Sequence, residues 1–327
     1  MRAIVVGGGI SGVACARALA AAGVPVIVRD RGRRLGGRMM SRTLRGTGTV
    51  HDGRVVDIGA SYFTVRDGDF AAAVGQLESA GVVRPWTTAF HVHGAEGMAG
   101  ISSGPMRYSA PAGLRSVVEW LAEGLDVSLG DEVAEVAIEG VGVRVDGEPV
   151  LAAALGLPDP QAQKIAPAPP ASHLTYEPII AVTLVFERRS WLDMDGVFVN
   201  DDPVLTWIAD DGRRRGDDAP VLVAHVNPVL SALHLDHPEG VLAQAVASVG
   251  RVLGMRTTPD WVDAHRWTYA KPLAARDEAF WIDDRAPVGV AGDAWAGGPR
   301  VEAAWLSGHR LGRALSERAG GVAPADE

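Results

Sequence analysis

The sequence predicts an α/β protein of two domains, one with a parallel sheet that alternates with helices and one with a mainly antiparallel sheet. Its 327 residues exceed the roughly 250–300 residues at which a single core stops growing. The first thirty residues have the pattern strand, glycine turn, helix, strand, which is typical of a parallel βαβ unit. Residues 173–283 instead contain one β-rich apolar run after another, with a single helical stretch near 239–254.

The composition is that of a folded, soluble protein and excludes several kinds of partner. Hydrophobic residues make up 47% of the chain and charged residues 22%. The net charge of −9 argues against nucleic acid, whose phosphates require a basic surface. Cys15 is the only cysteine, and the nine histidines show no metal-ligand spacing. No apolar run approaches the roughly 20 residues that span a bilayer. We therefore expect a reduced, cytoplasmic protein that binds no metal, nucleic acid or membrane.

The N-terminal βαβ unit occupies residues 3–30. Residues 3–6 form a short apolar run, as expected for a buried parallel strand. A helix is predicted over about residues 10–22, with Gly23 and Pro25 as its stop signals. The run PVIVRD is a second buried strand that ends in Asp30.

The turn between the first strand and the helix has G-x-G-x-x-G spacing. Gly7 permits the tight turn, Gly9 allows a pyrophosphate to approach the backbone, and Gly12 allows the helix to pack closely on the strand. Ile10 and Ser11 begin the helix, whose N-terminal N–H groups would face the phosphates. This Rossmann-like arrangement predicts dinucleotide binding, and the alternative is a glycine-rich turn without a ligand.

The stretch DRGRRLGGRM follows the second strand and adds a basic loop. Asp30 lies where an acid can accept a hydrogen bond from a ribose hydroxyl, and we include Arg31 beside it among the predicted cofactor contacts. Gly36 and Gly37 allow close approach of the backbone, and Arg38 is predicted to meet a pyrophosphate. An acid for the ribose and an arginine for the phosphates suit an extended FAD. The alternative is a solvated arginine loop.

The segment VVDIGASYFTVRD, residues 55–67, is a short strand followed by a glycine and two aromatic residues. Small residues and then rings, just after the phosphate loop, could line an isoalloxazine. Of the two rings, we expect Phe63 in the core and Tyr62 in the pocket.

The C-terminal region predicts a second contact with the cofactor. A strand ends at Gly292 and Asp293, and a helix is expected from Pro299 to about Leu315. The N-terminal N–H groups of that helix would stabilise negative charge at the N1/O2 edge of a reduced flavin. Asp293 could accept a hydrogen bond from a ribityl hydroxyl, or it could simply cap the turn.

The middle of the chain supplies the predicted substrate domain. We expect a short helix at 113–122, short strands over 126–154 and a Pro/Ala-rich crossover at 156–172. Trp207, Trp267 and Tyr269 could line a substrate pocket, although each could also belong to the core. His225 could place a polar group over the flavin, or it could be an ordinary edge histidine. The net charge of −9 does not exclude an anionic substrate, because a local cluster such as Arg213–Arg215 can outweigh the global sign.

These elements predict a discontinuous domain organisation. Residues 1–75, 106–172 and 284–320 form the FAD-binding domain, residues 76–105 and 173–283 form the substrate domain, and residues 321–327 are a flexible tail.

Six segments, in order from residue 1 to about 315, carry a family resemblance: VVGGGISG, DRGRRLGGRM, DIGASYFTVRD, PMRYSAPAGLRSV, HRWTYAKP and GDAWAGGPRVEAAWLSG. Together they resemble the bacterial renalase branch of the FAD-dependent amine oxidase superfamily. The resemblance implies a two-domain fold like that of p-hydroxybenzoate hydroxylase, with non-covalently bound FAD.

The resemblance also implies residue roles and an activity. It places the glycine turn, Asp30 and Arg38 on the ADP portion and the Val133 backbone near the adenine. It further implies that Ala60, Ser61 and Tyr62 lie along the flavin. At the ribityl and O2 end it implies Gly292, Asp293 and the Val301 backbone N–H group. Relatives of this kind oxidise 2- and 6-dihydro isomers of NAD(P) to β-NAD(P)+, with hydride transfer to flavin N5 and reduction of O2 to hydrogen peroxide.

Three other functions remain open from the residues alone. A flavin amine oxidase acting on a small amine could use Lys271 to hold a water molecule near the flavin. A non-catalytic flavin-binding protein and an NAD-dependent dehydrogenase are the other two possibilities.

Overall fold

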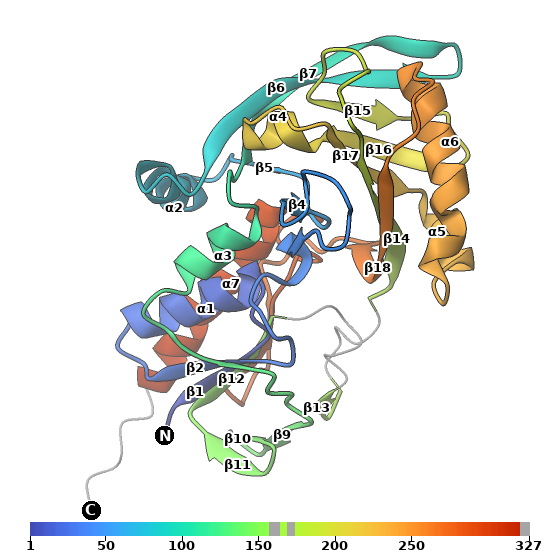
Figure 1. The fold of residues 1–327 in the computed structure, drawn as a ribbon. Coiled ribbons are helices and arrows are strands. Elements are labelled where there is room, and N and C mark those ends of the chain that lie inside the picture. The colour runs from blue at the N-terminus through green and yellow to red at the C-terminus, as the bar shows by residue number, and fades with distance from the viewer. Residues whose placement is uncertain (157–163, 169–173, 321–327) are drawn as a thin grey trace, which may run out of the picture.

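The computed structural model of the chain describes residues 1–156, 164–168 and 174–320. One domain contains the N-terminus and the C-terminal helix, and a second domain with a large sheet faces it in the upper half of Figure 1. The predicted α/β fold with a parallel-sheet domain and a sheet-rich second domain is confirmed. Most of the predicted crossover at 156–172 and the whole predicted tail at 321–327 lie outside the described residues.

The first domain is built on a six-stranded sheet in the order β19-β20-β12-β1-β2-β8. Its strands pair in parallel except for the edge pair of β19 and β20. All four residues of the central strand β1 are buried, as its continuous apolar run predicts. The strands are β1 (Ala3–Val6), β2 (Val26–Asp30), β8 (Asp126–Leu129), β12 (Ala152–Leu155), β19 (Trp281–Ile282) and β20 (Val288–Val290).

Helices α1 (Ile10–Ala21), α3 (Arg115–Leu121) and α7 (Val301–Gly320) belong to this domain. Helix α7 is the helix predicted at 299–315. It begins two residues later than predicted and ends five residues later. A Cβ atom at Gly308 would lie 1.9 Å from the Ser11 carbonyl oxygen, so glycine allows α7 to approach the backbone of α1. Gly12 lies against the Gly7 carbonyl oxygen in the same way, with a hypothetical Cβ–O distance of 1.9 Å.

Two smaller sheets complete the first domain. One has the order β11-β10-β9-β13, with β9 (Val136–Glu139), β10 (Gly142–Val145), β11 (Glu148–Val150) and β13 (Ile165–Ala166). The other pairs β3 (Ser41–Thr43) with β4 (Val55–Asp57). A short 3₁₀ helix, η1 (Gly37–Met39), precedes β3.

The second domain is built on an eight-stranded sheet in the order β18-β14-β17-β16-β15-β6-β7-β5. All neighbours are antiparallel except β15 and β6, in agreement with the predicted mainly antiparallel domain. The strands are β5 (Phe63–Thr64), β6 (Arg84–Gly94), β7 (Gly97–Ser109), β14 (Tyr176–Val185), β15 (Gly196–Val199), β16 (Leu205–Asp210), β17 (Val221–Val226) and β18 (Trp261–Pro272).

One amphipathic helix covers a face of this large sheet. Helix α6 (Leu242–Leu253), preceded by the 3₁₀ turn η4 (Pro238–Val241), buries Ala245, Val249 and Val252 against strands β14 to β17. Its position agrees with the helix predicted near 239–254. Three further helices escaped the sequence analysis: α2 (Gly68–Ser79), α4 (Asp211–Arg215) and α5 (Pro228–Leu233). Two of them have fewer than seven residues, too few for a periodic apolar pattern.

Segments on both sides of the predicted domain boundaries enter the large sheet. Residues 76–105 supply β6 and most of β7, and residues 173–283 supply β14 to β18. The short strand β5 and the end of β7 also pair in this sheet, although they fall within the ranges predicted for the first domain. The exact division into domains stays a prediction. None of the described helices is long and apolar enough to cross a membrane.

Candidate functional site

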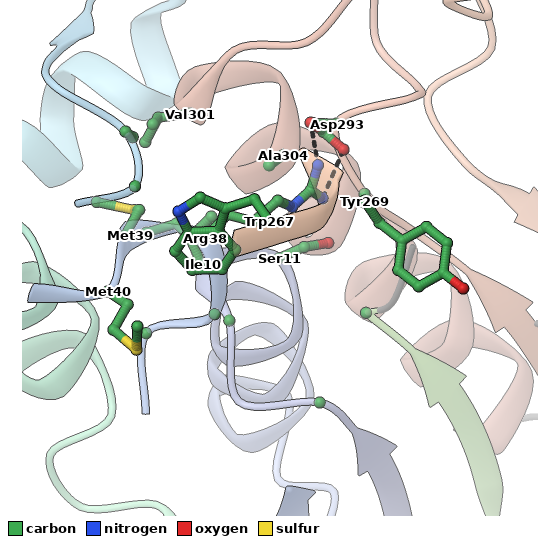
Figure 2. A pocket seen from close by; sticks show the side chains of 18 of the residues that line it. Ile10, Ser11, Arg38, Met39, Met40, Trp267, Tyr269, Asp293, Val301 and Ala304 are labelled. Atoms are coloured by element: carbon green, nitrogen blue, oxygen red, sulfur yellow. Dashed lines mark hydrogen bonds and ion pairs between the residues drawn. The ribbon is translucent and has the colours of Figure 1, made fainter. Parts of the chain in front are cut away.

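A cavity of about 1090 Å³ lies where the glycine turns of the first domain face the large sheet of the second. Figure 2 shows part of its lining. Of the residues predicted to contact cofactor or substrate, only Gly12 and Trp207 are missing from the lining. Those that line it are Gly7, Gly9, Ile10, Ser11, Asp30, Arg31, Gly36, Gly37, Arg38, Ala60, Ser61, Tyr62, Val133, His225, Trp267, Tyr269, Gly292, Asp293 and Val301.

The two glycine turns lie directly against each other. The Gly36 N–H group donates to the Gly8 carbonyl at 2.9 Å, and Gly9 and Gly36 form an isolated β-bridge. A Cβ atom at Gly37 would lie 3.3 Å from the Gly9 Cα atom, which is tighter than ordinary contact. Gly36 and Gly37 also have φ angles of 124° and 51°, which favour glycine. The doubled glycine thus brings the basic loop onto the first turn and leaves backbone exposed to the cavity.

Asp30 fixes the shape of these turns. One carboxylate oxygen accepts from the Gly8 N–H group at 2.5 Å, and the other accepts from the Gly32 N–H group at 2.6 Å. The carboxylate therefore holds the first glycine turn and the start of the basic loop, and it still borders the cavity. Val133 lies near this end, and its carbonyl accepts a hydrogen bond from Lys164.

Arg38 and Asp293 form an ion pair that the sequence did not indicate. The Arg38 guanidinium donates twice to the Asp293 carboxylate, at 2.6 and 2.7 Å, as Figure 2 shows, and once to the Ala270 carbonyl at 3.2 Å. Burial by itself would lower the pKa of Arg38, but Asp293 outweighs that effect and the pKa is raised. Arg38 was predicted to bind the pyrophosphate and Asp293 the ribityl chain. Their ion pair joins the N-terminal and C-terminal parts of the first domain at the cavity wall.

Two helix N-termini point to the same cavity. Ile10 and Ser11 begin α1, and Val301 begins α7. The first N–H groups of a helix lack partners within the helix, so both ends can bind anionic or electron-rich groups. The Ser11 hydroxyl oxygen is buried and has no hydrogen-bond partner among the described residues. The backbone turns and this unpaired hydroxyl fit a bound dinucleotide cofactor.

The opposite wall of the cavity consists of aromatic and imidazole side chains. His265, Trp267 and Tyr269 alternate on β18 and therefore share one face of the sheet. The Trp267 indole is fixed by donating to the Ile58 carbonyl at 2.7 Å. His265 escaped the sequence analysis, although its spacing of two from Trp267 was a signal for it.

Both imidazoles of this wall are neutral near pH 7. Burial lowers the pKa of His225 to about 4, with a further contribution from Arg214. Burial also lowers the pKa of His265 to about 4, with further contributions from Arg42 and Arg266. The wall therefore presents rings without charge.

Trp207 lies behind the wall. It is 7% exposed, and its indole N–H donates to the Ser61 hydroxyl at 3.0 Å. Its ring centroid lies 5.9 Å from that of Tyr62, which does line the cavity. Trp207 thus supports Ser61 and Tyr62 from the core side and has no surface on the cavity.

The Arg213–Arg215 cluster, which could have offset the negative net charge locally, does not border the cavity. Arg214 and Arg215 are buried and form ion pairs with Asp211 at 2.6 and 3.1 Å. Arg213 forms ion pairs with Asp193 and Asp218. None of the three lines the cavity. Positive charge at the cavity comes from the predicted residues Arg31 and Arg38 and from arginines that were not predicted, among them Arg66, Arg107, Arg115, Arg266 and Arg300.

These features define a class of protein in which a βαβ domain with a glycine turn and an antiparallel sheet enclose one cavity for a dinucleotide cofactor and a second ligand. Residues 76–315 match the family of flavin containing amine oxidoreductases, and residues 5–77 match the NAD(P)-binding Rossmann-like domain. The chain belongs to the flavin-containing amine oxidoreductase family.

Solved structures from several proteins share the fold. A protein of Exiguobacterium sp. 255-15, provisionally assigned as a protoporphyrinogen oxidase, is 16% identical over 97% of this chain and 99% of its own, with a TM-score of 0.76. A triple mutant of putrescine oxidase is 18% identical, with the same coverage and a TM-score of 0.77. Cyclohexylamine oxidase from Brevibacterium oxydans IH-35A is 14% identical, again with 97% and 99% coverage, and its TM-score is 0.72.

Family membership confirms the predicted superfamily and the predicted cofactor. The protein is an FAD-dependent oxidoreductase. No cluster of metal-ligating side chains occurs among the residues that the structure describes.

Proposed function

We propose that the protein is a renalase-like oxidase that converts 2- and 6-dihydro isomers of NAD(P) to β-NAD(P)+. The observation that carries this proposal is the chemical character of the cavity wall opposite the glycine turns. Tyr62, Trp267 and Tyr269 offer flat apolar surface, and His225 and His265 are uncharged near pH 7. A planar, uncharged dihydronicotinamide ring suits such a wall.

The carboxylates of the cavity support the same choice. Each already has a partner in the protein: Asp30 with backbone N–H groups, Asp131 with Arg29, Glu132 with Lys164 and Asp293 with Arg38. A protonated amine would therefore find no carboxylate in the described lining that lacks a partner. Oxidation of a dihydronicotinamide needs orientation of the ring more than a charged partner or a base.

The roles of the protein groups follow from their positions. The glycine turns, the helix N-termini and Arg38 would hold the cofactor, and the rings of β18 and Tyr62 would orient the substrate and exclude water. Bound FAD would accept the hydride of the substrate and pass two electrons to O2, which gives hydrogen peroxide. Cys15, the only thiol, is buried in α1 and absent from the cavity lining, which supports non-covalent attachment.

Anaerobic stopped-flow reduction of the FAD-loaded protein tests the proposal. The 2- and 6-dihydro isomers should bleach the flavin rapidly, whereas β-NADH and small amines such as putrescine should not. Rapid bleaching by an amine, with no reaction of the dihydro isomers, would overturn the proposal.

A second candidate is oxidation of a small amine, because several relatives that share the fold carry amine oxidase names. Lys271 lines the cavity from an exposed position at its rim. If this function holds, Lys271→Met should slow reduction of the flavin by the amine. The cytoplasmic location stays a prediction.

A further inference from the structure

Arg107 on β7 is a buried cation without an acid partner. Its exposure is 6%, and it lies in the cavity lining. The Nη1 atom of its guanidinium is buried and meets no hydrogen-bond acceptor among the described residues. No ion pair of the described chain includes it, in contrast to Arg38, Arg214 and Arg215. A buried charge without a partner is costly, so proteins rarely keep one unless it serves a ligand.

Two aromatic rings hold this guanidinium in place. Its Cζ atom lies 4.1 Å from the Phe90 ring centroid and 5.8 Å from that of Tyr62. The ring faces attract the cation but supply no oxygen acceptor for its N–H groups, and the buried Nη1 atom has no acceptor among the described residues. The contacts therefore orient the group without neutralising it.

The backbone nearby leaves room for the same group. A Cβ atom at Gly104 would lie 3.1 Å from Nη2 of Arg107, closer than ordinary contact, so glycine at this position accommodates the guanidinium. Gly104 has no positive φ angle, so its conformation does not itself demand glycine.

The surroundings of Arg107 place it at the substrate part of the cavity. It pairs with Thr64 in the register of β5 and β7 and lies beside Tyr62, the residue predicted for the flavin face. The residues predicted for the ADP portion lie elsewhere: Asp30 ends β2, and Val133 lies in the segment between β8 and β9.

We propose that Arg107 is a specificity-determining residue that binds an oxyanion of the substrate, a carboxylate or a phosphate, by charge-assisted hydrogen bonds. This inference rests on the proposed function in one respect, namely that the cavity binds an oxidisable substrate beside the flavin. It adds that Arg107 is the protein group that holds an oxyanion of this substrate, which in a dihydro-NAD(P) isomer is a phosphate. The planar fork of an arginine matches either oxyanion with two parallel hydrogen bonds.

The test uses the FAD-loaded protein and four probes that share one ring: benzoate, phenyl phosphate, benzamide and benzylamine. Binding is followed by the perturbation of the flavin absorption spectrum. The wild-type protein should bind at least one of the two anions more tightly than neutral benzamide, and cationic benzylamine should bind most weakly. The tighter of the two anions then identifies carboxylate or phosphate as the preferred group. Preference for benzylamine would overturn the proposal, and this measurement needs no variant.

Variants then locate the preference. Arg107→Gln should weaken anion binding by roughly 30-fold or more and leave benzamide binding nearly unchanged. Arg107→Lys should retain part of the preference, and Gly104→Ala should reduce it by displacing the guanidinium. Arg256→Gln is the matched control, because it removes one exposed arginine outside the cavity. If Arg107→Gln instead loses FAD while anion binding persists in the loaded fraction, Arg107 serves the cofactor and the proposal is wrong.

The two proposals can fail separately. If the dihydro isomers do not reduce the flavin but the anion preference depends on Arg107, the proposed function is wrong and the oxyanion site stands. If the isomers reduce the flavin with the same KM in wild type and Arg107→Gln, the proposed function stands and the oxyanion site is wrong.

Discussion

The arginines of α4 and the arginine of β7 are buried in the same domain but in opposite electrostatic situations. Arg214 has a fully buried side chain, and its Nη2 atom lies 2.6 Å from a carboxylate oxygen of Asp211, which is also fully buried. Arg215 joins them by ion pairs with Asp211 and with Asp57 of β4. The Arg107 guanidinium instead lies against the rings of Phe90 and Tyr62, and it forms no ion pair among the described residues.

This difference distinguishes buried charges that stabilise the fold through ion pairs from a buried charge that is available to bind a ligand. The α4 cluster connects the domains, because Asp57 lies on β4 of the first and Asp211 on α4 of the second. Arg54, just before β4, adds a further ion pair with Asp211 at 3.0 Å. Three buried polar atoms at the cavity have no hydrogen-bond partner in the described chain. They are Nη1 of Arg107, the hydroxyl oxygen of Ser11 and Nε2 of His225. The charges of α4 thus compensate one another in ion pairs, whereas the buried charge of Arg107 borders the cavity without an ion pair among the described residues.

The largest loss of stability is expected when the ion pairs of the α4 cluster are broken. Asp211→Asn removes the carboxylate shared by Arg54, Arg214 and Arg215, and it leaves buried cations with too little compensation. Breaking a buried ion pair by removing one partner costs about 3–5 kcal/mol of unfolding free energy. Urea unfolding of the FAD-loaded protein measures this loss. Asp193→Asn is the control, because its carboxylate is 78% exposed and should contribute roughly 0–1 kcal/mol. Equal losses for the two variants would contradict a structural role of the cluster.

The same carboxylate predicts a dependence of stability on pH. Burial by itself would raise the pKa of Asp211, but Arg215, Arg214 and Arg54 outweigh it and hold the pKa well below its usual range. A carboxylate whose pKa is depressed in the folded state stabilises the fold above its unfolded pKa of about 3.9 and loses that contribution as the pH falls further. Wild-type stability should therefore decrease below about pH 4, and Asp211→Asn should lack this part of the decrease.

A smaller effect is expected where a paired charge lies at the cavity itself. Arg38→Ala should weaken FAD binding by roughly 10- to 150-fold, since hydrogen bonds to charged groups contribute about 1.5–3 kcal/mol each. The ion pair with Asp293 allows another explanation, in which Arg38 only positions that carboxylate. The double variant Arg38→Ala/Asp293→Asn distinguishes them by FAD titration. If Arg38 meets the cofactor directly, the double variant stays weak; recovery of affinity would show that Arg38 acts only through Asp293.

The local parts of this structure could be predicted from the sequence, and the long-range pairings could not. Residues 3–30 contain their own strand, turn and helix signals, so that unit was predicted nearly to the residue. Arg38 and Asp293 are 255 positions apart, and each was selected alone without any sign that they pair. Trp207 was predicted to line a substrate pocket because it is an aromatic residue of a strand. Only the three-dimensional structure, in which its indole donates to the Ser61 hydroxyl, shows that it lies behind the cavity wall.

The ion pairs of the buried arginines likewise could not be predicted from the sequence. The consecutive arginines Arg213–Arg215 suggest a positive surface, because the sequence cannot show that Asp211 pairs with Arg214 and Arg215. Arg107 drew no notice, since an arginine in a strand is ordinary until its partners are counted in three dimensions.

The smallest expected effect compares one substitution in the two regions. Ser109 is fully buried, and its hydroxyl donates to the Arg214 carbonyl at 2.8 Å, whereas the hydroxyl oxygen of Ser11 has no partner in the described chain. Ser109→Ala should lower the unfolding free energy by about 1 kcal/mol and leave the Kd for FAD unchanged. Ser11→Ala should leave the apoprotein equally stable, because no hydrogen bond is lost, and raise the Kd for FAD by roughly 2- to 10-fold.

The decisive result is that Ser109→Ala should change only the stability and Ser11→Ala only the Kd for FAD. Both substitutions remove one hydroxyl oxygen from a buried serine, so the loss of packing is the same and only the hydrogen-bond partner differs. Urea unfolding of the apoprotein and FAD titration by fluorescence quenching measure the two effects on the same samples. If Ser11→Ala destabilises the apoprotein as much as Ser109→Ala does, the Ser11 hydroxyl already has a partner such as a buried water molecule. An unpaired polar atom would then be no guide to the ligand at this cavity.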